Sequence, residues 1–296
     1  MSLDTTPSAV AAAPVIPKVR RGLPALLIGN PTFAFGVLIL TVVFLLAITA
    51  GWLFPGDPQD MVGMPLLWPF QDMAYPLGTD SLGRDVASGL VYGARVSLII
   101  GFSAAAIGLA IGTLVGAIGG YYGGIFDNIL VRFTELFQTV PPFLLAVVIV
   151  AIGEPSLSVM AIAIGIASWP QIARLVRAQF RSLKEQDFVM AARGLGYSNA
   201  RIIFIEILPN ALPPVLVTAS VMVAGAILTE TGLSFLNMGD PNLVSWGSMI
   251  GEGRDQLRTA WFLTALPGLA TAITVLALNL IGDGLNEVFN PRMRQR

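Results

Sequence analysis

Long uncharged runs alternate with short charged segments along the chain. A helix that crosses the hydrocarbon core of a bilayer, roughly 30 Å thick, needs about 20 largely uncharged residues. Six runs approach or exceed this length: 22–56, 96–126, 136–153, 155–173, 207–229 and 259–282. We therefore predict an all-α integral membrane protein with six transmembrane helices. The third and fourth runs are barely long enough, and only Glu154 and Pro155 mark their junction, which predicts a tight hairpin.

Prolines and glycines refine this pattern. Pro141 and Pro142 predict a kink or a late start in the third span. The second span carries glycine at every fourth position, which forms one stripe on a helix. Such stripes let membrane helices approach closely, so we interpret this one as a packing surface rather than as part of a substrate path. Its members are Gly108, Gly112, Gly116, Gly120 and Gly124.

Basic residues set the predicted orientation, because Lys and Arg are retained on the cytoplasmic side of short loops. With both termini in the cytoplasm, only four of the 17 Lys and Arg residues lie outside: Arg84, Arg95, Arg254 and Arg258. The polar lead before the first apolar run does not resemble a secretory signal, whose basic residues lie at its start. We expect that lead to be a disordered tail.

Composition then excludes several classes of function. Hydrophobic residues make up 55% of the 296 residues and charged residues 12%, about half the charged share of a soluble domain. The chain has no Cys and no His, which excludes disulfides, zinc-thiolate sites and histidine-dependent hydrolysis. A net charge of −1 argues against nucleic acid as a partner. We predict no metal site and no cofactor on this chain.

One large charged segment, residues 174–206, lies between the fourth and fifth spans and falls on the cytoplasmic side. Phe188, Ala191, Ala192 and Leu195 follow helical spacing and predict an amphipathic helix. Glycines then end this helix, and Ser198 is placed to cap a second one that stops before Pro209. A helix lying on the membrane surface and a helix docking into a partner's groove both fit this composition.

The residues of this segment resemble the EAA loop of ABC-importer permeases. That pattern is Glu-Ala-Ala, three residues, Gly, nine residues, Ile, one residue and Leu-Pro. The matching positions are Ala191, Ala192, Gly196, Leu208 and Pro209. Met190 replaces the Glu and Glu206 replaces the Ile, so no salt bridge is expected from position 190.

Further blocks resemble the C-type permease subunit of dipeptide and oligopeptide importers, of the peptide/nickel permease family. They include Pro76-Leu-Gly-Thr-Asp-Ser-Leu-Gly-Arg-Asp85 and Glu230-Thr-Gly-Leu-Ser-Phe-Leu236, with shorter matches at 92–97, 245–247, 267–268 and 282–285. The resemblance implies a type I ABC importer permease fold in a bacterial cytoplasmic membrane. It also implies a homologous second permease, two cytoplasmic ATPases that bind ATP and Mg²⁺, an extracytoplasmic binding protein and surrounding lipid as partners.

The resemblance assigns ATPase coupling to the EAA loop, which would act as a lever. The coupling residues it implies are Asp187, Phe188, Ala191, Ala192, Arg193, Gly194, Leu195, Gly196, Arg201 and Pro209. The sequence supports this division of labour, because neither Lys18 nor Lys184 follows the glycine-rich run of a phosphate-binding loop. The chain is therefore expected to be a transport subunit and not an enzyme.

Acidic residues are weaker candidates. Glu230 is expected near the outer end of the fifth span, as a residue of the translocation path or as a structural tie for the loop after it. Asp283 lies at the inner end of the sixth span, without the second mid-membrane carboxylate that an aspartyl protease needs. Asp72, Trp246 and Asp255 are candidates for binding-protein docking, although tryptophans also anchor at headgroups.

The expected organisation is a tail at 1–30, a first helix at 31–54, an extracytoplasmic segment at 55–95, a five-helix core at 96–285 and a second tail at 286–296. The core includes the cytoplasmic coupling loop at 174–209. Dipeptides or oligopeptides are the expected substrates, with nickel complexes or glutathione as alternatives. An ion-coupled secondary transporter is the rival class, although the mid-span charges that it would use are missing.

Overall fold

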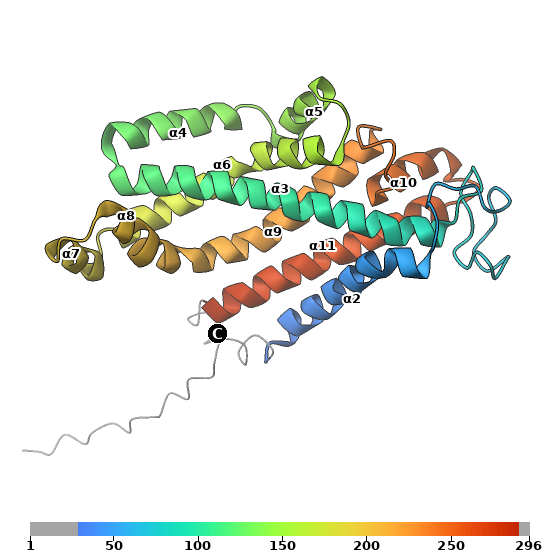
Figure 1. The fold of residues 1–296 in the computed structure, drawn as a ribbon, viewed down its shortest axis with the longest axis horizontal. Coiled ribbons are helices and arrows are strands. Elements are labelled where there is room, and N and C mark those ends of the chain that lie inside the picture. The colour runs from blue at the N-terminus through green and yellow to red at the C-terminus, as the bar shows by residue number, and fades with distance from the viewer. Residues whose placement is uncertain (1–28, 290–296) are drawn as a thin grey trace, which may run out of the picture.

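A computed structural model describes residues 29–289, which form a long helical bundle (Figure 1). This part of the chain contains no β-strand beyond isolated bridges. Its helices are α2 (Pro31–Leu53), α3 (Val86–Tyr122), α4 (Gly124–Gln138), α5 (Pro142–Ile152), α6 (Leu157–Leu183), α7 (Asp187–Gly194), α8 (Asn199–Arg201), α9 (Leu208–Phe235), α10 (Trp246–Gly253) and α11 (Phe262–Phe289). A π-helical turn, Ile202–Ile207, joins α8 to α9, and a 3₁₀ turn, Arg254–Gln256, follows α10.

The number of spans agrees with the prediction. Five helical segments are long and apolar enough to cross a membrane, and α4 with α5 makes a sixth span if the bent pair counts as one. This confirms the all-α membrane fold class. The tail predicted at 1–30 lies almost wholly outside the described residues, as does the end of the tail at 286–296.

The third span differs from the predicted hairpin helix at 136–153. It begins at α4 and bends by 79° between Gln138 and Pro142. Pro141 lacks a backbone N–H and disfavours a helical conformation in the residue before it, which accounts for the break. The predicted kink is thus present, but the helix before it lies mostly ahead of the predicted span.

Two helices extend beyond their apolar runs. Helix α6 continues through three arginines to Leu183, although its apolar run ends at Ala173. Helix α3 begins at Val86 rather than at the predicted residue 96, because Asp85 caps it by accepting the amide of Ala87 at 3.0 Å. The irregular segment after α2 therefore ends at Asp85, and the range 55–95 predicted to be extracytoplasmic includes the first turns of α3.

The glycine stripe packs α3 directly on α6. A Cβ atom added at Gly112 would lie 2.7 Å from the carbonyl oxygen of Trp169, and one at Gly116 would lie 2.5 Å from that of Ala173. Only glycine permits this approach of the two backbones. This confirms the packing interpretation. Gly124 does not share it, because it begins α4 with a φ of +58° and has open space beside it.

The two ends of the bundle carry different structures. Helices α7 and α8 lie at one end, whereas α10 and the irregular segment between α2 and α3 lie at the other (Figure 1). We call these the inner end and the outer end, after the orientation that the basic residues predict. Helix α2 packs along α11 at the edge of the bundle, where the Asn30 side chain donates to Glu287 at 2.6 Å. This arrangement presents one candidate site at each end.

Candidate functional site

Helix α7 is held to the bundle by a small apolar face. Val189 and Ala192, one turn apart, are buried in a cluster that includes Phe180 of α6 and Ile202 and Ile207 of the π-helical turn. The same cluster reaches α3 through Tyr121. A helix of eight residues is too short to be stable in water without such contacts. The packing therefore fixes α7 across the ends of three spans.

The predicted apolar face of α7 needs correction. Only Ala192 of the four predicted residues points into the protein, whereas Phe188, Ala191 and Leu195 are exposed and Leu195 keeps 73% of its surface accessible. Helix α7 has apolar residues on two sides. The predicted face combined residues from both sides and left out Val189. Phe188 and Ala191 form an apolar i, i+3 pair just as Val189 and Ala192 do, so spacing in the sequence does not select the buried side.

The turn after α7 uses glycine for a conformational reason. Gly196 adopts a φ of +78°, which L-residues with a side chain rarely adopt, and a Cβ added there would meet no atom within 4 Å. Gly194 is equally open. The described chain therefore leaves the space around this turn empty.

We call the segment 187–209, which contains α7, α8 and the π-helical turn, the elbow. Its second part differs in part from the prediction. Ser198 caps α8 as predicted, its Oγ accepting from the amide of Arg201 at 3.4 Å. The helix does not stop before Pro209, because the π-helical turn leads directly into α9. Pro209 is the second residue of α9 and follows the π-helical turn without a break, the amide of Leu208 bonding to the carbonyl of Ile203. The elbow is thus continuous with the fifth span.

The charged residues of the elbow are arranged around two tyrosines. The guanidinium of Arg193 lies 5.7 Å from the ring centroid of Tyr121, and that of Arg201 lies 3.8 Å from the ring centroid of Tyr197. Asp187 is exposed in the first turn of α7, where a negative charge favours the helix dipole. Pro209 is exposed as well. The elbow combines cationic side chains with uncovered apolar ones.

A wide apolar cavity opens between α3 and α9 beside this elbow. Its volume is about 730 Å³. Its lining includes Leu114, Ile118 and Tyr122 of α3, and Phe204, Leu212 and Leu216 of the π-helical turn and α9. The sequence analysis did not identify these residues, because an apolar residue facing a cavity carries the same signal as one facing lipid.

Glu230 is fully buried near the outer end of α9, with 0% of its surface exposed. Its carboxylate accepts from Ser97 of α3 at 2.9 Å and from Ser234 of α9 at 2.8 Å. The Ser97 hydroxyl in turn accepts from the backbone amide of Trp246 at 3.4 Å. These bonds join α3, α9 and the start of α10. The structural tie expected for Glu230 concerned the segment from Thr231 to Asn237, and only the bond to Ser234 lies within it.

The candidate docking residues separate into two groups. Asp72 and Asp255 are exposed on the outer end. Trp246 is buried, with 2% of its surface exposed, and its Nε1 donates to the carbonyl of Leu90 at 3.0 Å. The expectation that Trp246 forms part of an external docking surface is therefore wrong, because its indole fills the junction of α10 with α3.

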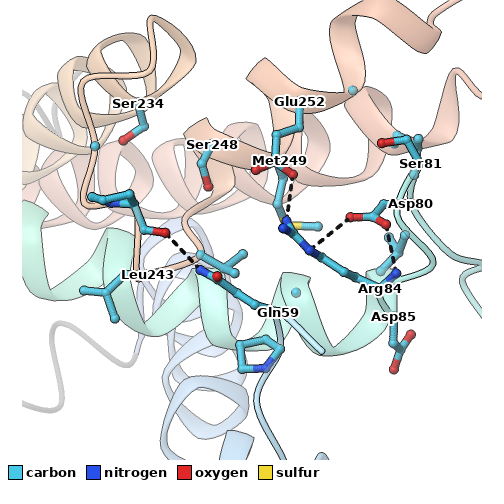
Figure 2. Close-up of a pocket in the computed structure, with 18 of the residues that line it drawn as sticks. Gln59, Asp80, Ser81, Arg84, Asp85, Ser234, Leu243, Ser248, Met249 and Glu252 are labelled. Atoms are coloured by element: carbon cyan, nitrogen blue, oxygen red, sulfur yellow. Dashed lines mark hydrogen bonds and ion pairs between the residues drawn. The ribbon is translucent and has the colours of Figure 1, made fainter. Parts of the chain in front are cut away.

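An outer pocket lies between the irregular segment, the start of α3 and α10. Its volume is about 250 Å³. Figure 2 shows Arg84 reaching between Asp80 and Glu252; its Nη1 donates to Glu252 at 3.2 Å, and its Nε lies 3.9 Å from Asp80. The Gln59 amide reaches the carbonyl of Pro241 across the pocket at 3.3 Å. Residues far apart in sequence thus bond to one another across the pocket at this end.

Burial affects two carboxyl groups of the outer pocket. Burial raises the pKa of Glu252, although Arg84 opposes that shift. Burial also raises the pKa of Asp85, although the amides of Ala87 and Ser88 oppose it. Among residues 29–289, no group of three acidic, Cys or His side chains is placed to hold a metal ion.

Comparison with known proteins places the chain in a family. Residues 108–295 match the family described as "Binding-protein-dependent transport system inner membrane component". A putative peptide transport system permease protein of Brucella abortus is 39% identical over 286 residues, covering 96% of this chain and 94% of the relative. The dipeptide transport system permease protein DppC of Escherichia coli K12 is 41% identical over 272 residues, covering 90% of this chain and 91% of DppC.

A solved structure shares the fold. A chain of the MetNI methionine ABC transporter in an inward-facing conformation superposes with a TM-score of 0.56 at 19% identity, covering 68% of this chain and 96% of that chain. The family match, the sequence relatives and the apolar spans together show what this chain is. It belongs to the binding-protein-dependent transport system inner membrane components and is a multi-pass membrane permease.

Proposed function

We propose that this chain is half of the translocation path of an ATP-driven importer and that α7 is its docking element for an ATPase subunit. The observation that carries this proposal is the uncovered side of α7. Phe188, Ala191 and Leu195 are exposed at the end of the bundle that the basic residues assign to the cytoplasm. A helix with an uncovered apolar side beside an empty glycine turn fits insertion into a groove of a partner protein.

The proposed assembly contains three kinds of component besides this chain. A homologous second permease completes the path and covers the apolar cavity between α3 and α9. Two cytoplasmic ATPases bind ATP and Mg²⁺ and dock on the α7 helices of the two permeases. An extracytoplasmic binding protein delivers the substrate to the opposite end. This chain hydrolyses no ATP, and it receives the work of the ATPases through displacement of α7.

Peptides are the proposed substrates. The relatives in Brucella abortus and Escherichia coli are named as peptide and dipeptide permeases and match nearly the whole chain. Uptake of a labelled dipeptide by proteoliposomes that contain the complete transporter tests this assignment. Competition by unlabelled dipeptide supports it, whereas competition only by nickel complexes or by glutathione would reassign the substrate.

The docking role is tested at Gly196. Asp and Asn are both short and tolerate positive φ better than other side chains, so Gly196→Asp and Gly196→Asn impose similar backbone strain and differ in charge. We expect Gly196→Asp to lower uptake per ATP hydrolysed more than Gly196→Asn does, because the charge is desolvated in the docking groove. Both variants should insert in the membrane normally. Unchanged uptake in Gly196→Asp would refute docking at this turn.

A second test measures assembly directly. Leu195→Asp places a charge on the uncovered side of α7, and Met73→Asp places the same charge at a residue that is 82% exposed at the outer end. We expect the ATPase subunit to copurify with the Met73→Asp chain and to be lost from the Leu195→Asp chain. Equal retention would contradict the proposal. Transport by the chain alone under an ion gradient would instead favour a secondary transporter.

The outer end is proposed to receive the binding protein. Asp72 and Asp255 remain candidate contacts because both are exposed there, whereas the buried Trp246 is withdrawn. The Asp72→Lys/Asp255→Lys double variant should reduce the stimulation of ATP hydrolysis by the binding protein while leaving basal hydrolysis unchanged. Undiminished stimulation would remove both residues from the docking surface.

A further inference from the structure

Tyr121, the penultimate residue of α3, contacts both short helices of the cytoplasmic elbow, α7 and α8. Its hydroxyl donates to Asn199 Oδ1 of α8 at 2.7 Å. The Nζ atom of Lys184, directly after α6, donates to its backbone oxygen at 3.4 Å. Arg193 of α7 lies over its ring. The side chain is 6% exposed and packs in the same apolar cluster as Val189.

These contacts join elements that are not neighbours along the chain. Helices α4, α5 and α6 separate the end of α3 from α7 and α8. Helix α9 continues the elbow covalently through the π-helical turn, whereas α3 meets the elbow only through side-chain contacts of this kind. Tyr121 holds the inner end of α3 in place relative to α7 and α8.

A displacement of α7 would reach the rest of the bundle through α3. Its glycine stripe fits α6 backbone to backbone, so the two helices are expected to move together. Near the outer end, Ser97 of α3 donates to Glu230 of α9. A movement imposed on the end of α3 is therefore passed to helices that line the bundle along its length.

We propose that Tyr121 is a positioning residue for energy coupling: its hydroxyl bond to Asn199 makes α3 follow the displacement of α7. This inference rests on the proposed docking role of α7 and adds the route by which the displacement enters the bundle. Without the bond, the inner end of α3 would follow α7 only through packing and through α6, and it would be displaced less. ATP hydrolysis would then continue with less substrate carried per ATP.

The alternative role for Tyr121 is packing alone, and the hydroxyl separates the two. Tyr121→Phe keeps the ring, its burial and its contact with Arg193, and it removes only the bond to Asn199. Tyr92→Phe is the matched control, because Tyr92 lies near the other end of α3 and its hydroxyl also makes a bond, donating to the carbonyl of Phe54 at 3.1 Å. Asn199→Ala removes the same bond from the other side, and Asn199→Asp keeps an acceptor oxygen.

The experiment reconstitutes the complete transporter in proteoliposomes and measures substrate taken up per ATP hydrolysed. We expect Tyr121→Phe and Asn199→Ala each to lower this ratio by about fivefold, the factor that one net hydrogen bond represents. The Tyr121→Phe/Asn199→Ala double variant should fall no further, because both changes break one bond. Tyr92→Phe and Asn199→Asp should retain the ratio.

Three results would overturn the inference. They are an unchanged ratio in Tyr121→Phe, additive losses in the double variant, and a drop in uptake matched by an equal drop in ATP hydrolysis or in assembled transporter. The Leu195→Asp variant, measured alongside, keeps this failure separate from failure of the docking proposal. If the ATPase is lost from the Leu195→Asp chain and Tyr121→Phe keeps a normal ratio, the docking proposal stands. Only the coupling role of Tyr121 is then refuted.

Discussion

The outer and inner ends of this permease satisfy their side chains in opposite ways. At the outer end, Trp246 and Glu230 are buried, and each makes hydrogen bonds to residues of this chain. Thr79 is likewise buried, and its hydroxyl accepts from the amide of Leu67 at 3.0 Å. At the inner end, Phe188 and Leu195 are exposed and Gly196 faces open space.

The difference indicates which of these residues are held by the fold of this chain and which are available to a partner. Exposed apolar side chains next to an empty glycine turn mark a surface that another protein covers. Buried polar groups with internal partners mark a region whose fold is set by the chain itself. The buried outer residues Trp246, Glu230 and Thr79 should therefore tolerate few changes in stability assays. The exposed inner residues Phe188 and Leu195 should tolerate many changes there, but those changes should impair assembly.

The largest expected effect is at Trp246. Trp246→Ala should lower the free energy of unfolding of the isolated chain in detergent by about 3–5 kcal/mol, because it empties a buried site and removes a hydrogen bond. Leu195→Ala should change it by less than about 0.5 kcal/mol. Chemical unfolding monitored by circular dichroism measures both. Similar losses at the two positions would contradict the contrast between the ends.

A smaller effect is expected at Glu230. Glu230→Ala leaves the Ser97 and Ser234 hydroxyls without their acceptor in a buried site, which should cost about 1–3 kcal/mol of unfolding free energy. Glu230→Gln keeps one acceptor oxygen and nearly the same volume, so its loss should be smaller. The same unfolding assay ranks the two variants. A loss in Glu230→Gln as large as that in Glu230→Ala would contradict this ranking, because it would mean that one acceptor oxygen does not maintain the serine bonds.

Helix α7 offers a comparison within the inner end. Val189→Ala should destabilise the local packing of α7 by about 1–2 kcal/mol, because Val189 is fully buried, whereas Ala substituted at the exposed Phe188 should not. Hydrogen exchange of the α7 amides, followed by mass spectrometry, measures this local stability. Faster exchange in Phe188→Ala than in Val189→Ala would reverse the assignment of the two sides of α7.

The smallest expected effect is a pH dependence at the outer end. Because burial raises the pKa of Asp85, the contribution of this group to folding is most favourable below its ordinary pKa and is lost as the pH rises through the higher folded-state pKa. Asn caps a helix as well as Asp does and carries no charge. Asp85→Asn should therefore match or slightly exceed the wild-type Tm at pH 7 and lose that advantage at pH 4. The opposite trend would mean that the ionised cap is favoured in the folded state.

Regular features of the bundle were predictable from local sequence. Glycine at every fourth position identified the packing face of α3, and Pro141 identified the break between α4 and α5. The start of α3 was missed because Arg95 ended the uncharged run. In the structure Arg95 lies within α3, and its Nε donates to the carbonyl of Ala47 on α2 at 3.2 Å. A charge with such a partner is compatible with a helix that continues past it.

The site residues show the limit of local patterns more clearly. Trp246 is buried by contact with Leu90, which lies 156 residues earlier, so its own neighbours in sequence could not indicate burial. Val189 and Leu195 are both apolar residues of one amphipathic helix. Only the packing of α6 and the π-helical turn decides which of them is covered.

The central claim, that the uncovered side of α7 faces the cytoplasm and is covered by an ATPase, is tested most directly by cysteine labelling. The chain has no native cysteine, so Leu195→Cys and Met73→Cys each provide a single reactive site. In intact cells, or in spheroplasts if an outer membrane limits access, a membrane-impermeant maleimide should label Met73→Cys and not Leu195→Cys. After lysis, Leu195→Cys should react in the isolated chain and be protected in the assembled transporter. Labelling of Leu195→Cys from outside sealed cells would contradict the account.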